Sequence, residues 1–512
     1  MINDTNVDDW ASLAAGRNRE HELGRHRVRI GRTTSRVYAA EEFRPVLVLG
    51  PQRSYKTSGF AVPAILDWEG PAVITSVRHD VLDDTFDWRS KLGSVAVFDP
   101  SAALVNTRYS SNRYNWNVLA ECRTWDGSVR TARALSEAGR AGGIQDGDFW
   151  FSAAAKLLTP HLFAASNNEY TMADVARWIN TQEEFEVRSL LQTVGHEGAI
   201  TSAEASWQRE DRARSSIYTT AEQVIRVFEY EDSNLTTGPF LDLDRFLASS
   251  SNTLYICAPP DEQEEYKPLF TGLVRTLVRK VYNLNNGVAD AEAQMVADDL
   301  DVELADPDRP SIGKRLLARM AGSADSASPV FSAKENAERE TSRANDSPTG
   351  NKAPPRCHLL LLLDEAGNIA PLKNLDTLAT TAAGTFVQLI CIFHDISQME
   401  ALYGPYPARS IVNNHSAFVV LPGSRDVTTI DYVVALLQGE RVANSVESTW
   451  VGPRPIRSMR RGEALLIYEN LRPIVLDLRS KFSDEVLRRK STGEAVAPDN
   501  QEAAAVIGTQ LG

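Results

Sequence analysis

Cysteine is scarce in this sequence, and no long apolar run is present. The chain has 512 residues but only four cysteines, and none of them forms a C-x-x-C pair. This spacing argues against a disulfide framework or a cysteine-based zinc site and is typical of reduced cytosolic thiols. No apolar stretch approaches the roughly 20 residues needed to span a bilayer, and the N-terminus lacks the apolar core of a secretory signal. We therefore expect a cytoplasmic protein that reaches the membrane only through partners.

An excess of positive charge is also missing. The formal net charge is -14, with 43% apolar and 24% charged residues, which is ordinary globular composition. An acidic chain does not coat nucleic acid with its whole surface, although a local basic channel stays compatible with this charge. The length predicts more than one domain, with ample chain to bury a core.

From Arg44 onward, short apolar runs alternate with segments of helical spacing. "PVLVLG" has the pattern of a buried strand, and "SGFAVPAILDW" follows it as a helix. "GPAVITSV", "GSVAVFDP", "NTLYICAPP" and "CHLLLLLDEAG" repeat the strand pattern later in the chain. Continuous apolar strands between helices predict an α/β fold with a mostly parallel sheet that is covered on both faces.

Changes in composition divide the chain into seven segments. Between the strand-rich parts, residues 116–248 show three-to-four-residue apolar spacing, which predicts an all-α insertion. Residues 287–355 are rich in Ala, Asp, Glu and Ser, which predicts a flexible insertion. The predicted segments are an N-terminal arm (1–38), a strand-rich α/β domain in three parts (39–115, 249–286 and 356–482), the all-α insertion (116–248), the flexible insertion (287–355) and a solvated C-terminal tail (483–512).

The stretch "GPQRSYKTS" follows the first apolar strand and precedes a helix. It fits the phosphate-loop pattern G-x-x-x-x-G-K-[ST] except that Tyr55 replaces the second glycine. Backbone N–H groups in such a loop surround phosphates, while Lys56 reaches the β/γ-phosphates and Thr57 binds Mg²⁺. The alternative is a lysine and a threonine that merely open an amphipathic helix. The predicted ATP-binding residues are Gly50, Pro51, Gln52, Arg53, Ser54, Tyr55, Lys56, Thr57 and Ser58.

Tyr55 is the weak point of this loop. A glycine lets the backbone approach the phosphates closely, in a conformation that other residues adopt at a cost of about 1–3 kcal/mol. We expect this cost to appear as weaker nucleotide binding or as a slightly different loop.

Paired carboxylates follow the most apolar strand of the chain. Residues 359–363 are all leucine, and Asp364 and Glu365 come directly after them. In a phosphate-loop ATPase the first carboxylate holds the Mg²⁺ shell and the second activates the attacking water. We predict these roles for Asp364 and Glu365, with Thr57 as the other metal ligand. The alternative is a strand that simply ends in an acidic turn.

A histidine supplies a third element of the predicted site. His394 ends the apolar run "FVQLICIFH", on a strand that we expect beside the one ending at Asp364. There its side chain can contact the γ-phosphate or the attacking water, and Gln398 follows one helical turn later. We therefore predict His394 as a catalytic residue together with Lys56 and Glu365, although a strand-end histidine is often only structural.

Several arginines have candidate roles outside this set. Arg212, Arg214 and Arg425 are candidates for an arginine that completes the site of a neighbouring subunit. A basic cluster near residue 460 can contact DNA phosphates, but we interpret it as a solvated face. It consists of Arg454, Arg457, Arg460 and Arg461.

With these motifs in place, the chain resembles the type IV secretion and conjugation coupling proteins, the TraG/TraD-like group of phosphate-loop ATPases within the FtsK/HerA-type superfamily. The likeness runs from Arg44 to Phe482 and includes "GPQRSYKTSG", "TSVRHD", "DFWFSAAAKLL", "LLLLDEAGNI" and "RRGEALLIYENLRPI". It implies a RecA-like nucleotide-binding domain interrupted by an all-α domain. It also implies a homo-hexamer that uses ATP and Mg²⁺ at the inner membrane.

The resemblance also implies partners. Members deliver relaxase-bound single-stranded DNA, or secreted protein substrates, to membrane-bound secretion components. The sequence departs from the family at Tyr55, at His394 in place of a sensor glutamine, and at Ala382-Ala383, where many members carry an arginine. The usual pair of N-terminal membrane helices is also missing.

Three functional hypotheses follow. The leading one is a coupling ATPase, peripheral at the inner face of the cell membrane, that uses hydrolysis to drive transfer. The second is a nucleotide-binding adaptor with little ATPase activity that recruits substrates to another motor. Tyr55 and Ala382-Ala383 favour the adaptor, whereas Lys56, Thr57 and the two carboxylates favour the enzyme. A translocase of double-stranded DNA is a third possibility, which the helical insertion disfavours.

Overall fold

The computed structural model describes residues 26–494, except residues 35, 77–78, 139–146, 230–234, 236–237, 260–261, 287–355, 438–441 and 443–453. The expected flexible insertion therefore lies outside the described residues, as do most of the expected N-terminal arm, the end of the expected tail and part of the "TSVRHD" stretch. The sheet and the sites discussed below belong to a unit formed by Met1–Val281 and Cys357–Gly512.

Among the described residues, eleven strands form one sheet in the order β2-β1-β11-β10-β9-β3-β8-β7-β4-β6-β5. The strands are β1 (Arg29–Arg32), β2 (Val37–Ala39), β3 (Val46–Leu49), β4 (Ala72–Ser76), β5 (Val95–Phe98), β6 (Thr253–Cys257), β7 (Leu359–Leu363), β8 (Val387–Phe393), β9 (Ala417–Val420), β10 (Glu463–Tyr468) and β11 (Ile474–Asp477).

The centre of the sheet is parallel. β3 pairs with β9 and β8, and β8 pairs with β7, all in parallel. One strand therefore separates the strand before the phosphate loop from the strand before the paired carboxylates, and this intervening strand ends beside His394. The mostly parallel α/β fold is confirmed, and His394 follows the strand next to β7 as predicted.

Both faces of these strands are buried, as their continuous apolar composition requires. Leu47 and Leu49 pack in the core on one face, whereas Val46 and Val48 pack in the core on the other. None of these four side chains is more than 1% exposed. Because side chains alternate along a strand, each of these strands contributes side chains to both cores.

The sheet continues on one side as antiparallel strands. β9 pairs with β10, β10 with β11, β11 with β1, and β1 with β2. β1 and β2 lie largely in residues 1–38, where the sequence interpretation placed a polar arm, so that interpretation was wrong for this part. In β1 only Ile30 and Gly31 are buried between two partly exposed arginines, which is too short a pattern to stand out in a sequence.

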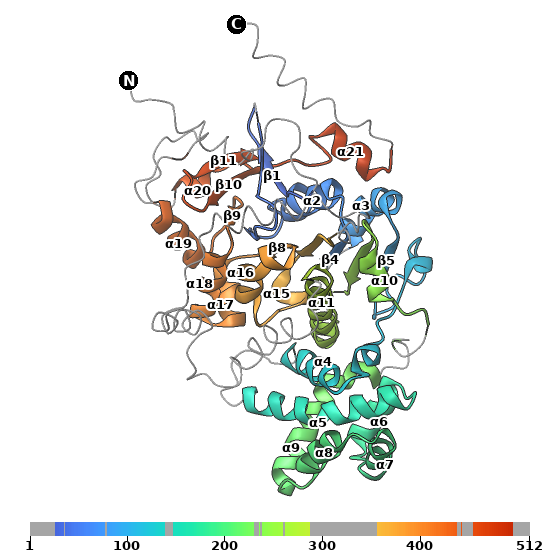
Figure 1. The fold of residues 1–512 in the computed structure, drawn as a ribbon. Coiled ribbons are helices and arrows are strands. Elements are labelled where there is room, and N and C mark those ends of the chain that lie inside the picture. Colours follow the sequence, from blue (N-terminus) through green and yellow to red (C-terminus); the bar gives the residue numbers. More distant parts are fainter. Residues whose placement is uncertain are drawn as a thin grey trace, which may run out of the picture. The chain divides into compact units, whose positions relative to one another are not determined.

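Helices of the strand-rich parts connect and cover these strands (Figure 1). They are α2 (Val62–Asp67), α3 (His79–Leu92), α11 (Gln263–Asn286), α15 (Ala366–Ile369), α16 (Leu375–Thr385), α17 (Ile396–Tyr403), α18 (Pro405–Asn414), α19 (Val427–Leu437), α20 (Arg454–Ser458) and α21 (Glu485–Ser491).

Within residues 116–248, the elements that the structure describes are α-helices and 3₁₀-helices, and no strand occurs among the described residues of this range. Thr171 shows how the local sequence starts such a helix, because its hydroxyl and the Asp174 side chain form a reciprocal capping box. The α-helices are α4 (Trp125–Ala138), α5 (Gly147–Asn167), α6 (Met172–Asn180), α7 (Phe185–Val194), α8 (Glu197–Trp207), α9 (Asp211–Ile225) and α10 (Leu243–Ala248).

The beginning of the predicted solvated tail is a packed helix instead. Leu487 of α21 is fully buried against Val62 and Leu66 of α2, and Asp484 caps the helix by accepting from the backbone N–H groups of residues 486 and 487. A single buried apolar residue in a charged heptapeptide gives little periodic signal, which is why the sequence did not reveal this contact.

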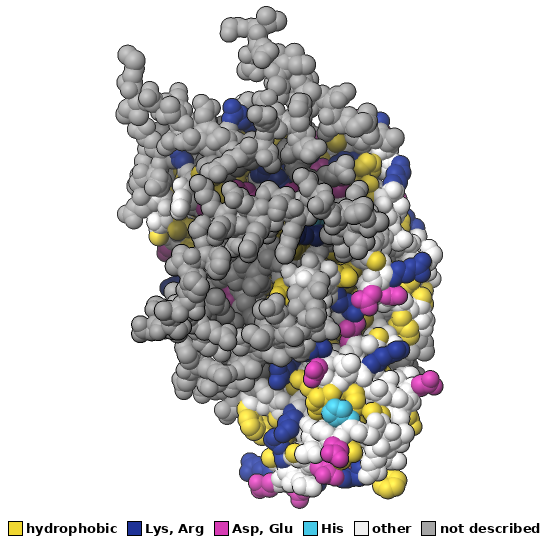
Figure 2. Space-filling view, in the orientation of Figure 1, with side chains coloured by type: hydrophobic (Ala, Val, Ile, Leu, Met, Phe, Trp, Pro, Cys, Tyr) yellow, Lys and Arg dark blue, Asp and Glu magenta, His cyan; other side chains and the backbone are white. Residues whose placement is uncertain are grey.

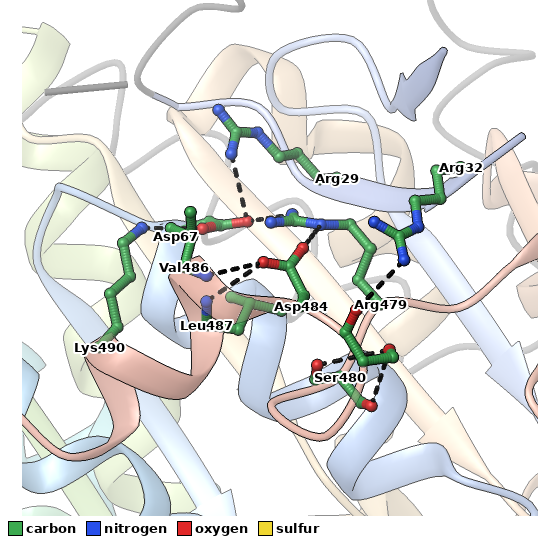
Figure 3. Close-up of polar contacts among 10 residues, drawn as sticks. Arg29, Arg32, Asp67, Arg479, Ser480, Asp484, Val486, Leu487 and Lys490 are labelled. Atoms are coloured by element: carbon green, nitrogen blue, oxygen red, sulfur yellow. Dashed lines mark hydrogen bonds and ion pairs between the residues drawn. The ribbon is translucent and has the colours of Figure 1, made fainter. Parts of the chain in front are cut away.

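Asp67 at the end of α2 anchors that helix with three cations (Figure 3). Arg479 donates to Asp67 and also to Asp484, while the Lys490 ammonium lies 2.9 Å from the other oxygen of Asp67. Arg29 of β1 lies 3.5 Å away. Burial by itself would raise the pKa of the Asp67 carboxyl, but the surrounding cations, Arg479 first, outweigh it and hold the pKa well below its usual range.

Replacing this carboxylate should therefore destabilise the fold. Asp67→Asn leaves buried cations without their partner, and we expect unfolding to become easier by roughly 3–5 kcal/mol, measured by urea denaturation at pH 7. A carboxyl whose pKa is lowered by folding stabilises the fold above its unfolded pKa, about 3.9, and loses this effect as the pH falls. The difference from wild type should narrow below about pH 4.

Asp477→Asn is the matched control, because Asp477 is exposed on the neighbouring strand β11. Asp477→Asn should have the same urea midpoint as wild type both at pH 7 and below about pH 4. Equal stability of Asp67→Asn and wild type at pH 7 would contradict the assigned role of Asp67.

Candidate nucleotide site

The predicted phosphate loop follows β3 and leads into a π-helix, η1 (Lys56–Ala61), which continues as α2. Arg53 and Tyr55 have backbone φ angles of 63° and 71°, in the left-handed region that favours glycine. Tyr55 thus adopts the strained conformation anticipated at the glycine position, at a cost of about 1–3 kcal/mol. The left-handed turn is kept although the glycine is missing.

Lys56 occupies the centre of the loop. Its ammonium donates to the carbonyl oxygens of Gly50 at 2.6 Å and Pro51 at 3.1 Å. The residue is only 7% exposed, and burial lowers the pKa of its ammonium despite the raising effect of nearby carboxylates. The loop therefore holds a partly desolvated cation where the motif places phosphate groups.

Asp364 follows β7 and faces Thr57. The Thr57 hydroxyl lies 3.4 Å from Asp364 Oδ2, while Oδ1 is buried without a hydrogen-bond partner among the described residues. Burial, and then the charge of Glu365, raise the pKa of Asp364 to about 7. A buried carboxylate oxygen with no donor beside a threonine hydroxyl fits a hard cation such as Mg²⁺, which prefers oxygen ligands.

Glu365 is held in a left-handed conformation at the start of α15, with φ 57° and ψ 51°. Asn368 donates to its Oε2 at 3.1 Å. The His394 Nε2 atom lies 3.8 Å from its Oε1. A left-handed glutamate is a strained residue, and such strain is concentrated at functional sites.

His394 connects the lysine to the glutamate. Its Nδ1 atom lies 2.8 Å from the Lys56 ammonium and must accept that hydrogen bond, because an ammonium only donates. The Nε2 side then faces Glu365. Burial, and next the charge of Lys56, lower the pKa of His394, which favours the neutral ring. Gln398 fixes the backbone by accepting from the His394 N–H at 2.9 Å.

These groups open into one cavity of about 420 Å³. The structure thus brings together the predicted Lys56, Thr57, Asp364, Glu365 and His394, along with most of the loop. It also adds four residues that the sequence interpretation did not place here, from α3, the turn before β10 and the segment after β11. The residues lining the cavity are Gln52, Arg53, Ser54, Tyr55, Lys56, Thr57, Ser58, Asp80, Asp84, Asp364, Glu365, His394, Arg461 and Phe482.

The other candidate arginines lie elsewhere in the chain. Arg212 and Arg214 belong to α9, where Arg214 pairs with Asp211, and Arg425 is exposed in the turn after β9. None of them lines the cavity of its own chain. On the face drawn in Figure 2, basic and acidic side chains of the described residues are interspersed.

Comparison with known protein families assigns nearly all of the described chain. Residues 8–300 match the family of type IV secretory system conjugative DNA transfer proteins, and residues 358–472 match the TraM recognition site of TraD and TraG. The first match covers more than half of the chain, so this protein belongs to the conjugative DNA transfer family of type IV secretory systems. The resemblance seen in the sequence is thereby confirmed. No curated protein sequence matches the chain significantly.

Solved structures show the same fold. The bacterial conjugative coupling protein TrwBdeltaN70 in its unbound form is 16% identical, covers 90% of each chain and gives a TM-score of 0.59. The same figures hold for plasmid coupling protein TrwB in complex with the ATP analogue ADPNP, and for TrwB in complex with ADP and Mg²⁺. The RecA-like phosphate-loop fold is therefore confirmed. None of the helices that the structure describes has the length and apolar character needed to span a bilayer.

The position of Lys56 leads to a direct test. Lys56→Ala removes the buried cation of the loop, and we expect it to weaken binding of a fluorescent ATP analogue by roughly 100-fold or more, measured by anisotropy. Lys156→Ala is the matched control, because Lys156 is exposed on α5 within the all-α segment. Equal binding by Lys56→Ala and wild type would show that this loop is not the nucleotide site.

Proposed function

We propose that the protein is the coupling ATPase of a conjugative type IV secretion system. The observation that carries this proposal is the convergence of Lys56, Thr57, Asp364, Glu365 and His394 in one cavity, in a chain of the conjugative DNA transfer family. These residues come from the ends of three adjacent parallel strands, which is where an α/β sheet binds its ligands.

The loop from Gly50 to Ser58 would bind the phosphates of ATP, with the Lys56 ammonium on the β/γ-phosphates. Thr57 and the partner-free oxygen of Asp364 would hold Mg²⁺, which neutralises phosphate charge when bound. The complexes of TrwB with ADPNP and with ADP and Mg²⁺ support this choice of ligand.

Glu365 would act as the base of hydrolysis. It takes the proton of the water that attacks the γ-phosphorus, while the bond from that phosphorus to the bridging oxygen of ADP breaks. His394 contacts both Lys56 and Glu365, so it would hold the Glu365 carboxylate in a fixed position relative to the phosphate that Lys56 binds. A neutral ring suits this role, since it donates through Nε2 and accepts through Nδ1.

The partners follow from the family rather than from the site. The protein would act as a homo-hexamer, peripheral at the cytoplasmic face of the membrane through membrane-bound secretion components. It would recruit relaxase-bound single-stranded DNA or secreted protein substrates. The match of residues 358–472 to the TraM recognition site supports a docking role for this part of the chain. Arg212, Arg214 and Arg425 remain candidates for completing the site of a neighbouring subunit.

A second candidate function is a nucleotide-binding adaptor with little ATPase activity. The left-handed conformation of Tyr55 favours it, because a strained loop can hold a nucleotide without turning it over quickly. The intact Glu365, with its own hydrogen-bonded partner Asn368, favours the enzyme, since an adaptor has no need of a base.

Hydrolysis by Glu365→Gln separates these functions. For an ATPase, wild type should hydrolyse ATP faster with single-stranded DNA, and Glu365→Gln should lose about 100-fold or more of this rate while still binding the ATP analogue. The measurement is steady-state phosphate release, with Glu400→Gln as control, since Glu400 does not line the cavity. Nucleotide binding without hydrolysis in wild type would support the adaptor instead.

Replacing His394 should affect the rate of hydrolysis more than the binding of nucleotide. His394→Ala should lower the maximal hydrolysis rate by about 10-fold to 100-fold, because the base is no longer linked to Lys56. The affinity for the ATP analogue should change much less, since the loop itself is untouched. His394→Gln keeps a side chain that both donates and accepts and should retain part of the rate. A rate equal to wild type in His394→Ala would show that the histidine is only structural.

A further inference from the structure

Arg461 lines the cavity but has no part in the catalytic scheme above. Its guanidinium lies over the ring of Tyr55, with the central carbon 4.7 Å from the ring centroid. Both residues line the cavity together with Lys56. Arg461 is exposed to solvent, as the sequence interpretation expected, and it also lies at the phosphate loop.

The backbone around Arg461 is fixed by a tight turn before β10. Gly462 has φ 97°, which only glycine adopts readily, and its carbonyl accepts from the Leu478 N–H at 2.7 Å. Glu463 closes the turn by accepting from the Arg460 N–H at 2.6 Å. These two hydrogen bonds hold the turn, and the turn fixes the backbone position from which the Arg461 side chain extends.

Tyr55 gives the guanidinium a rigid support. Its ring is half-buried and packs against the core on one face of the sheet. Gly59 makes room for it, because a side chain at that position would begin 3.1 Å from Tyr55 Cβ and 3.2 Å from Leu478. The strained residue therefore presents a fixed aromatic surface to the cavity.

The charge of Arg461 is available for a ligand. The side chain is exposed, and no carboxylate among the described residues forms an ion pair with it. Of the two α3 carboxylates that line the cavity, Asp84 is already paired with Lys481. Stacking on an aromatic ring leaves the in-plane N–H donors of a guanidinium free, and their fork geometry suits phosphate oxygens.

We propose that Arg461 is a phosphate-binding residue of the nucleotide site and that Tyr55 is its positioning residue. The proposal rests on the nucleotide-binding function proposed above. It explains a tyrosine at a glycine position, since the ring that strains the loop also places a second cation beside Lys56. The site would then bind the phosphate groups of its nucleotide with Arg461 in addition to Lys56, both from the same chain.

The test is a double-mutant cycle on Mg²⁺-dependent binding of a fluorescent ATP analogue. Arg461→Ala should weaken binding by roughly 10-fold to 100-fold, and Arg461→Lys by less. Tyr55→Asn removes the ring but keeps a residue that tolerates the left-handed conformation, so it should weaken binding through the loss of the support. The double variant should be no weaker than Arg461→Ala alone, and Tyr55→Phe, which keeps the ring, should weaken binding less than Tyr55→Asn.

Arg460→Ala is the matched control, because Arg460 is an exposed neighbour that does not line the cavity. It should bind like wild type. Unchanged binding by Arg461→Ala overturns the proposal. Fully additive effects of Arg461→Ala and Tyr55→Asn overturn the role of Tyr55.

Lys56→Ala distinguishes this failure from that of the proposed function. If Lys56→Ala loses binding and Arg461→Ala does not, only the assignment of Arg461 is wrong. If neither variant loses binding, the nucleotide site itself is wrong. Thermal melting of each variant excludes loss of binding through unfolding, and binding is measured well below the lowest melting temperature among the variants.

Discussion

The register of three parallel strands is the constraint on which the nucleotide site depends. Leu49 of β3 pairs with Phe393 of β8, and Leu363 of β7 pairs with Cys391 of β8. The residues that follow, Gly50, His394 and Asp364, therefore leave the same edge of the sheet within two residues of one another in register. Because side chains alternate along a strand, a slip of one residue would move each buried side chain from the core on one face of the sheet to the core on the other. The two cores thus fix the register, and the register brings the lysine, the histidine and the carboxylates together.

The site concentrates unfavourable features that the rest of the fold has to support. Arg53, Tyr55 and Glu365 are left-handed without being glycine, at about 1–3 kcal/mol each. Asp364 has a buried oxygen with no donor among the described residues. Such groups persist only where the surrounding structure over-determines them. Here the surroundings are strands that are buried on both faces.

Local patterns explain why so much of the site could be predicted from the sequence. A phosphate loop, a leucine strand ending in Asp364-Glu365 and a strand ending in His394 each carry their own signal, and parallel topology brings strand ends together. Contacts between distant segments carry no such signal. The stacking of Arg461 on Tyr55 joins residues that no periodicity relates. β1 and β2, at one end of the sheet, were missed because both are short and β1 is half polar, so tertiary pairing decides their conformation.

The three cations around Asp67 have a consequence for where this domain ends. Arg479 and Lys490 both follow the last strand, β11, and only Arg29 precedes α2. A chain cut directly after the sheet would keep every strand but leave a buried carboxylate with one cation at 3.5 Å. It would also uncover Val62 and Leu66 beside the phosphate-loop helix. The smallest piece of this protein that can be expected to fold as a unit therefore extends beyond the sheet to at least Lys490.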